Sequence, residues 1–149
     1  MKFFTLQIVK VMMLDIKINA KLEELANMRQ QIMSFIKNVS LDNEVANLIV
    51  LAVDEICTNL IKYAYKYNQN SIIAVLVETC PHQIIIKIKD SAVPFDIRQH
   101  LDKNICEHIR KMVPGGLGMP LVGKIMDEIY YEEKNEEREF NVLTLIKDI

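Results

Sequence analysis

Residues 51–67 read LAVDEICTNLIKYAYKY, and this stretch decides how the rest of the chain is interpreted. It has no Gly or Pro, and its apolar residues recur with the period of an amphipathic helix. These apolar residues are Leu51, Ile56, Leu60, Ile61, Ala64 and Tyr65. Glu55 and Asn59 stand at i and i+4, so their side chains share one face of the predicted helix. Such a pair is either a solvated surface pair or a general base beside a metal ligand.

The composition is that of one domain with a hydrophobic core. The chain has 149 residues and half of them are hydrophobic, so we expect a single domain over residues 1–149. Residues 1–12 are expected to be a peripheral strand or tail. The net charge is −2 and there is no long basic run, which argues against direct contact with nucleic acid or an anionic membrane.

Two further features bear on the compartment. The apolar runs are far shorter than the roughly 20 residues of a membrane-spanning helix, and the N-terminus lacks a small-residue cleavage site. Cys57, Cys80 and Cys106 have no CxxC spacing, and three is an odd number. We therefore expect reduced thiols in a cytoplasmic protein.

The order of the predicted elements is strand, two helices, hairpin, helix and hairpin. Alternation of apolar residues and turn residues predicts strands at 14–20, 71–79, 83–89, 129–132 and 140–147. Helical periodicity predicts helices at 21–38, 43–67 and 117–128, and one irregular helical turn is expected around 103–111. The charged turn at 132–139 is expected to be solvated. This order favours an α+β two-layer sandwich, with helices on one face of a mostly antiparallel sheet.

Two more patterns carry chemistry. Gly115, Gly116 and Gly118 open the last predicted helix, where glycines and free backbone N–H groups suit a phosphate as well as a simple turn. Asp90 ends a strand and begins the loop DSAVPFD. Its carboxylate either accepts a hydrogen bond from an adenine amino group or initiates a turn. The three histidines have no metal-ligand spacing.

Four stretches, taken in order, resemble the motifs of the GHKL ATPases, which have the Bergerat fold. They are DEICTNLIKYAY, DSAVPFD, GGLGMPLVGKIMDEI and NVLTLIK. The similarity is greatest to the anti-sigma factor serine/threonine kinases of the RsbW and SpoIIAB type. It covers roughly residues 13–149. The resemblance implies ATP and Mg²⁺ as cofactors.

The resemblance also implies a role for each matching residue. Glu55 would be the general base and Asn59 the Mg²⁺ ligand, while Asp90 would bind the adenine amino group. The phosphate-binding loop would comprise Gly115, Gly116, Leu117 and Gly118. Arg110 occupies the place of a basic residue in the lid before these glycines. Lys62, in the Lys-Tyr pattern of histidine kinase catalytic domains, would contact a phosphate, although a solvated lysine is the alternative.

The chain departs from the family pattern at two positions that matter here. Tyr63 stands where the family often has His, and Ala92 stands where the first box usually has Gly. If the backbone at Ala92 must adopt a positive φ, alanine carries an energetic cost. If it need not, alanine is harmless.

Three functions follow from these patterns. The first is an ATP-dependent serine/threonine kinase that phosphorylates a STAS-domain anti-anti-sigma protein, binds a sigma factor and forms a homodimer. The second, suggested by Ala92, is a partner-binding regulatory module without kinase activity. The third, suggested by Lys62, is a stand-alone histidine-kinase-type catalytic domain. A histidine kinase that phosphorylates itself is not expected, because all three histidines lie at or beyond position 82.

Overall fold

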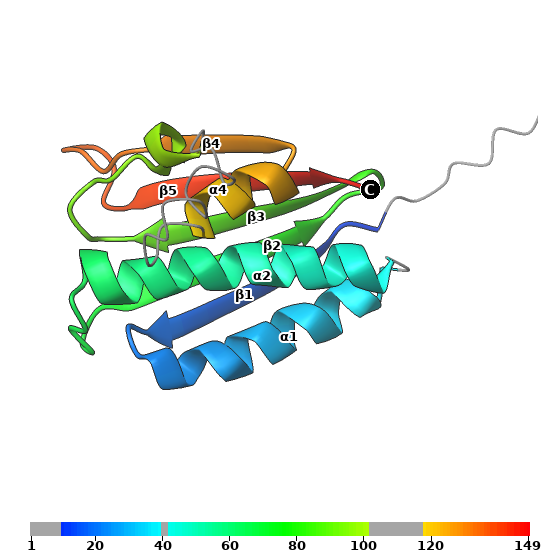
Figure 1. The fold of residues 1–149 in the computed structure, drawn as a ribbon, viewed down its shortest axis with the longest axis horizontal. Helices are drawn as coiled ribbons and strands as arrows, with labels where there is room; N and C mark the ends of the chain where they lie inside the picture. Colours follow the sequence, from blue (N-terminus) through cyan, green and yellow to red (C-terminus); the bar gives the residue numbers. More distant parts are fainter. Residues whose placement is uncertain (1–9, 40–41, 102–117) are drawn as a thin grey trace, which may run out of the picture.

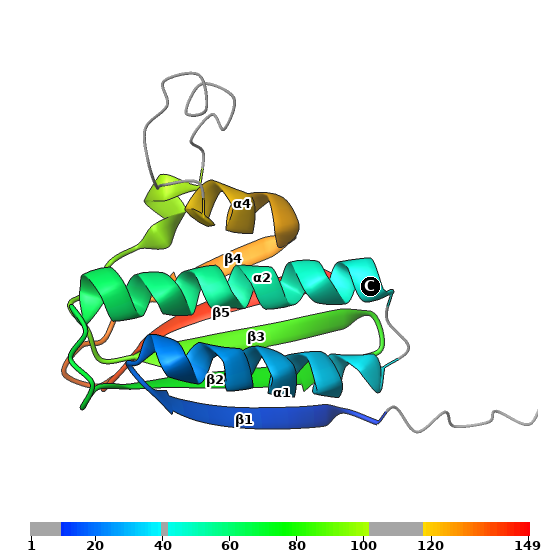
Figure 2. The same cartoon turned by 60° about the horizontal axis from the view of Figure 1, so that its bottom comes forward.

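The computed structural model describes residues 10–39, 42–101 and 118–149. In this part of the chain, five strands form one sheet in the order β1-β2-β3-β5-β4, and every neighbouring pair is antiparallel. The strands are β1 (Met12–Asn19), β2 (Ile72–Thr79), β3 (Gln83–Asp90), β4 (Glu128–Glu132) and β5 (Asn141–Asp148). Helices α1 (Leu25–Lys37), α2 (Asn43–Asn59) and α4 (Gly118–Ile125) lie on one face of the sheet (Figures 1 and 2). The predicted α+β sandwich is confirmed.

Alternate residues of the strands face the helices, as the period of two requires. The register places Val77 opposite Ile86, and Ile86 opposite Leu145, so the inward side chains of the three central strands are aligned across the sheet. The buried apolar residues of these strands are Ile73, Val75, Val77, Ile84, Ile86, Ile88, Leu143 and Leu145. They form one side of the hydrophobic core, and the buried faces of α1 and α2 form the other.

The first predicted helix begins differently from expectation. A 3-10 turn, η1 (Leu22–Glu24), precedes α1, and Leu22 is 38% exposed, although the helical period of residues 21–38 puts it on one face with Leu25, Met28 and Ile32. The Glu24 carboxylate accepts a hydrogen bond from the backbone N–H of Asn19 at 2.8 Å. This contact ties the turn to the end of β1. Met28 and Ile32, further along, are fully buried as expected.

Helix α2 begins where the sequence predicts. The Asp42 carboxylate accepts a hydrogen bond from the backbone N–H of Glu44 at 2.9 Å, which caps the helix. The α-helical hydrogen bonds end at Asn59, and a π-helical turn, η2 (Leu60–Ala64), follows. The prediction of one regular helix to residue 67 is therefore wrong in its last two turns. Leu51, one of the residues of the predicted apolar period, is 37% exposed.

Helix α4 is shorter than predicted and ends at Ile125 rather than near residue 128. The chain leaves the helix because Asp127 pairs with β5. The Asp127 backbone N–H donates to the Ile146 carbonyl at 2.9 Å, and its carboxylate accepts from the Asp148 N–H at 2.7 Å. Asp127 is thus a link between the helix and the sheet. The expected helical turn at 103–111 lies outside the described residues.

The charged turn at 132–139 is ordered by its own side chains rather than merely solvated. The Asn135 side-chain oxygen accepts hydrogen bonds from the backbone N–H groups of Glu137 and Arg138 at 2.9 and 2.8 Å. The Lys134 ammonium donates to the Ser91 carbonyl at 2.6 Å. The expectation of a purely solvated turn is therefore wrong, and the turn reaches the loop after β3.

Cys57 and Cys80 are free thiols, and burial raises the pKa of the Cys57 thiol, so that side chain is neutral at physiological pH. Cys106 lies outside the described residues. Among the helices that the structure describes, none is both long and apolar enough to cross a membrane.

Candidate functional site

A pocket of about 900 Å³ lies between α2, η2, the end of β3, the loop that follows β3, and the start of α4. Five predicted site residues line it: Glu55, Asn59, Lys62, Asp90 and Gly118. The structure therefore brings together residues that are more than 60 positions apart. The other four predicted residues, Arg110, Gly115, Gly116 and Leu117, lie outside the described part of the chain. The roles assigned to all nine stay predictions.

Glu55 and Gly118 are in direct contact across the pocket. Gly118 is the first residue of α4, and a Cβ added to it would overlap Glu55 Oε2 and lie 3.0 Å from Glu55 Cδ. Only glycine permits this approach without displacing the carboxylate. The Glu55 carboxylate consequently lies at the N-terminal end of α4, where the helix dipole favours negative charge.

Asn59 lies one helical turn after Glu55 and lines the same pocket. Among the described residues there is no group of three or more His, Cys, Asp or Glu that could hold a metal ion. Mg²⁺ in nucleotide sites is held by one or two protein oxygens and completes its shell with water and phosphate oxygens. The side-chain oxygen of Asn59, with Glu55 nearby, fits that kind of site.

Asp90 is 6% exposed and is held by two hydrogen bonds to its Oδ1. The Ala92 backbone N–H donates at 2.9 Å, and the Asn141 Nδ2 donates at 3.0 Å. Burial raises the pKa of the Asp90 carboxyl, while these two hydrogen bonds and the positive charge of Lys134 oppose that rise. A buried carboxylate with fixed partners suits recognition of a polar ligand group.

Ala92 causes no backbone strain. Among the described non-glycine residues, positive φ angles occur at Lys66 and Tyr67, and Ala92 does not share them. Its N–H and carbonyl are both used, in hydrogen bonds with Asp90 and with Asn141. The backbone at position 92 does not need a positive φ, so alanine in place of the usual glycine carries no conformational cost there.

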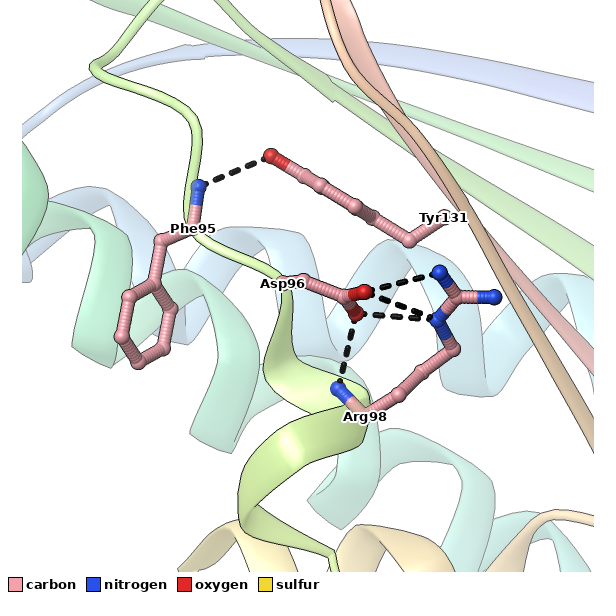
Figure 3. Close-up of polar contacts among 4 residues, drawn as sticks. All are labelled: Phe95, Asp96, Arg98 and Tyr131. Atoms are coloured by element: carbon pink, nitrogen blue, oxygen red, sulfur yellow. Dashed lines mark hydrogen bonds and ion pairs between the residues drawn. The ribbon is translucent and has the colours of Figure 1, made fainter.

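The loop after β3 is held by Tyr131 of β4. The Tyr131 hydroxyl accepts a hydrogen bond from the Phe95 backbone N–H at 2.9 Å (Figure 3). One residue later, the Asp96 carboxylate caps the 3-10 turn η3 (Ile97–His100) and pairs with the Arg98 guanidinium at 2.7 Å. Phe95 and Tyr131 both line the pocket, so this contact shapes one of its walls.

The π-helical turn and the residues just after it contribute two lysines to the lining of the pocket. Lys62 and Lys66 both line it, and Lys66 adopts a φ of 48° just beyond the turn. π-Helical turns within α-helices are frequent at functional sites. Lys66 was missed by the sequence analysis, although its spacing of four residues from Lys62 was visible. The widened turn itself has no evident sequence signal.

Three residues that do not line the pocket but hold the loop after β3 were also missed: Tyr65, Lys134 and Asn141. The Tyr65 hydroxyl accepts a hydrogen bond from the Ser91 N–H at 2.7 Å and donates to the Ile72 carbonyl of β2 at 3.3 Å, and β2 neighbours β3 on the side opposite to β5. Asn141 is 1% exposed and precedes Leu143 and Leu145 on the inward face of β5. A polar residue in phase with buried leucines was the signal that could have identified it.

A model of the histidine kinase-like ATPase domain matches residues 18–147. The chain belongs to this family. Among characterised relatives, the Serine-protein kinase RsbW of Bacillus cereus (strain AH820) is 26% identical over 120 residues, covering 78% of this chain and 74% of that protein. RsbW of Bacillus anthracis matches equally well. The resemblance to the GHKL superfamily and to its RsbW type is thus confirmed.

Two solved structures share the fold of this chain. The SiaB-SiaC complex from Pseudomonas aeruginosa contains a chain that superposes with a TM-score of 0.68 at 13% identity, over 90% of this chain and 88% of that one. The RsbU and RsbW domains of a Mycobacterium tuberculosis protein superpose with a TM-score of 0.62 at 14% identity. That match covers 91% of this chain and 32% of the longer polypeptide.

Proposed function

We propose that this protein binds Mg-ATP in the pocket and transfers the γ-phosphoryl group to a serine or threonine of a STAS-domain anti-anti-sigma protein. The observation that carries the proposal is the meeting of Glu55, Asn59, Asp90 and Gly118 in one pocket of a histidine kinase-like ATPase domain. The relatives named as serine-protein kinases support the reaction class. The structural neighbour solved as the SiaB-SiaC complex supports a protein partner.

The residues divide the chemistry between them. Glu55 takes the proton from the incoming hydroxyl as its oxygen attacks the γ-phosphorus, and ADP leaves from the opposite side. Asn59 supplies an oxygen ligand to Mg²⁺, which offsets charge on the phosphates when bound. Asp90 accepts a hydrogen bond from the adenine amino group. Lys62 and the loop at Gly115, Gly116, Leu117 and Gly118, with Arg110, position the phosphates, so catalysis is mostly positioning and electrostatics.

The regulatory part of the proposal concerns partners. We propose that the protein acts in the cytoplasm as a homodimer. It holds a sigma factor inactive until the STAS-domain protein competes with that sigma factor for binding to it. Phosphorylation of the STAS-domain protein would end that competition. Neither role requires direct contact with nucleic acid.

The test is phosphoryl transfer from γ-labelled ATP to a cognate STAS-domain protein in the presence of Mg²⁺. Because Glu55→Gln keeps the size of the side chain but cannot accept the proton, its transfer rate should fall by about 10²–10⁴-fold. Its affinity for ATP should change much less. Glu23→Gln, an exposed glutamate of η1 outside the pocket lining, is the matched control. Equal label transfer by wild type and Glu55→Gln would refute the role of Glu55.

A histidine-kinase-type activity is the second candidate, because Lys62 lines the pocket as that pattern requires. A phosphohistidine is acid-labile, whereas phosphoserine and phosphothreonine survive acid. Acid treatment of the labelled product therefore separates the two. The module without kinase activity was suggested by Ala92, and the relaxed backbone there removes that reason.

A further inference from the structure

Asn141 is a buried residue whose side-chain nitrogen and oxygen both form hydrogen bonds. It lies directly opposite Asp90 in the register of β3 and β5. Its Nδ2 donates to Asp90 Oδ1 at 3.0 Å and to the Ala92 carbonyl at 2.9 Å. Its Oδ1 accepts from the backbone N–H of Lys134 at 3.0 Å. The Lys134 N–H can only donate, so it fixes which end of the amide is the oxygen.

This arrangement gives the two oxygens of Asp90 different environments. Both hydrogen bonds that the described residues make to the carboxylate end on Oδ1. Among the described residues, no fully buried side-chain oxygen lacks a hydrogen-bond partner, so Oδ2 keeps some exposure. Asp90 lines the pocket, and Oδ2 is therefore the atom available to a ligand.

We propose that Asn141 is a positioning residue that sets the base selectivity of the pocket. By holding Asp90 Oδ1, it presents Oδ2 as a hydrogen-bond acceptor to the exocyclic amino group of an aminopurine nucleotide. A 6-oxo purine offers an oxygen at that place and is rejected. The inference rests on the proposed function, because it assumes that the pocket binds a purine nucleotide.

The charges around Asp90 are consistent with an acceptor. Lys134 places a positive charge near it from the turn between β4 and β5. Tyr131 of β4 and Cys57 of α2 also interact with it, and burial raises the pKa of both side chains, which keeps them neutral at physiological pH. Asn141 adds a donor that cannot titrate. With these neighbours, the Asp90 carboxylate acts as the acceptor in a hydrogen bond with the amino group of the nucleotide.

Tyr65 provides the matched control. Its hydroxyl holds the adjacent Ser91 N–H from the opposite side but makes no hydrogen bond to the Asp90 carboxylate among those the structure records. Tyr65→Phe therefore loosens the same turn while leaving the contact between Asn141 and Asp90 in place. If Asn141 acted only by ordering the turn, both substitutions would have the same effect on base selectivity.

The experiment measures dissociation constants for ATP and for inosine triphosphate (ITP), with the full chain and Mg²⁺. We expect wild type to prefer ATP by about tenfold or more, since an acceptor facing an acceptor leaves a buried group unpaired. Asn141→Leu should weaken ATP binding by about tenfold and change ITP binding by less than about threefold. Tyr65→Phe should keep the wild-type ratio. Unchanged ITP binding also shows that the Asn141→Leu variant is folded.

Each other outcome has a defined meaning. Wild type that binds neither nucleotide refutes the proposed function and the inference together. If wild type binds ATP and Asn141→Leu keeps the same preference for ATP over ITP, the inference alone is refuted. If Asn141→Leu binds neither nucleotide, Asn141→Val decides, because valine is smaller, suits a strand and has no side-chain donor. The preference of Asn141→Val for ATP over ITP must then be weaker than that of wild type, and an unchanged preference overturns the inference.

Discussion

Gly118 and Glu55 set each other's position at the scale of single residues. A Cβ at position 118 would overlap Glu55 Oε2, so Gly118→Ala must displace the carboxylate from the start of α4. Because proton abstraction depends on the position of that carboxylate, phosphoryl transfer should fall by about tenfold or more. Rates at saturating ATP, compared with wild type, check this result.

Gly123→Ala is the matched control for this prediction. It lies in the same helix, gains the same methyl group, and its Cβ would meet Leu101 Cβ at 3.2 Å rather than Glu55. It should lower stability through crowding but leave the transfer rate near that of wild type. Equal loss of transfer in both variants would show that the helix, not the Glu55 carboxylate, is what matters.

At the scale of elements, the end of the long helix is where the sequence was least informative. Helical periodicity continues through residue 65, yet the structure widens into η2 after Asn59. The Tyr65 hydroxyl contacts Ser91 and Ile72, and the Tyr67 N–H donates to the Ile61 carbonyl. These contacts are tertiary or specific to the widened turn, so a local pattern cannot predict them. Strands with a period of two, by contrast, were predicted to within about two residues.

Tyr67 makes this helix end testable. Its φ of 61° lies in the left-handed region, which costs residues with a Cβ about 1–2 kcal/mol and costs glycine little. Glycine also has more conformational entropy in the unfolded chain, which offsets part of this advantage. Tyr67→Gly should therefore be more stable than Tyr67→Ala by about 0.5–1 kcal/mol. Urea denaturation of both variants measures the difference. If Tyr67→Ala were as stable as Tyr67→Gly, the left-handed helix end would be contradicted.

Asp127 makes the junction between α4 and β5 sensitive to pH. The hydrogen bond from the Asp148 N–H, followed by the contact with Lys147 at 3.1 Å, lowers the pKa of the Asp127 carboxyl. A lowered pKa in the folded state stabilises the protein above the ordinary value of 3.8, and this is lost as the pH falls through the folded value. Asp127→Asn should therefore be less stable at pH 7, by under about 1 kcal/mol for so exposed a group.

The pH dependence of that difference is the check. Free energies of unfolding of wild type and Asp127→Asn should converge only as the pH falls through the lowered folded pKa of Asp127, which lies below 3.8, because both proteins then carry a neutral side chain there. Lys124→Met, in the last turn of α4, controls for a general change in surface charge. A stability gap that stays constant with pH would exclude the ionised carboxylate as its cause.

At the scale of the whole molecule, the sequence predicted polar residues that line the pocket better than the residues that hold them. Glu55, Asn59 and Asp90 interrupt apolar patterns or end a strand, so each one attracts notice without a structure. Asn141 and Lys134 contact the loop after β3 only because the sheet order puts β5 beside β3. That order depends on pairing between distant segments, which local periodicity does not encode.

The central claim is that this pocket binds Mg-ATP through Asp90. Calorimetric titration of the full chain with Mg-ATP tests it most directly, in wild type and in Asp90→Asn. The substitution keeps the shape of the side chain and places an amide donor toward the adenine amino group. We predict saturable binding by wild type and a dissociation constant at least about tenfold higher for Asp90→Asn. Equal affinity in the two proteins, or no binding by wild type, would contradict the claim.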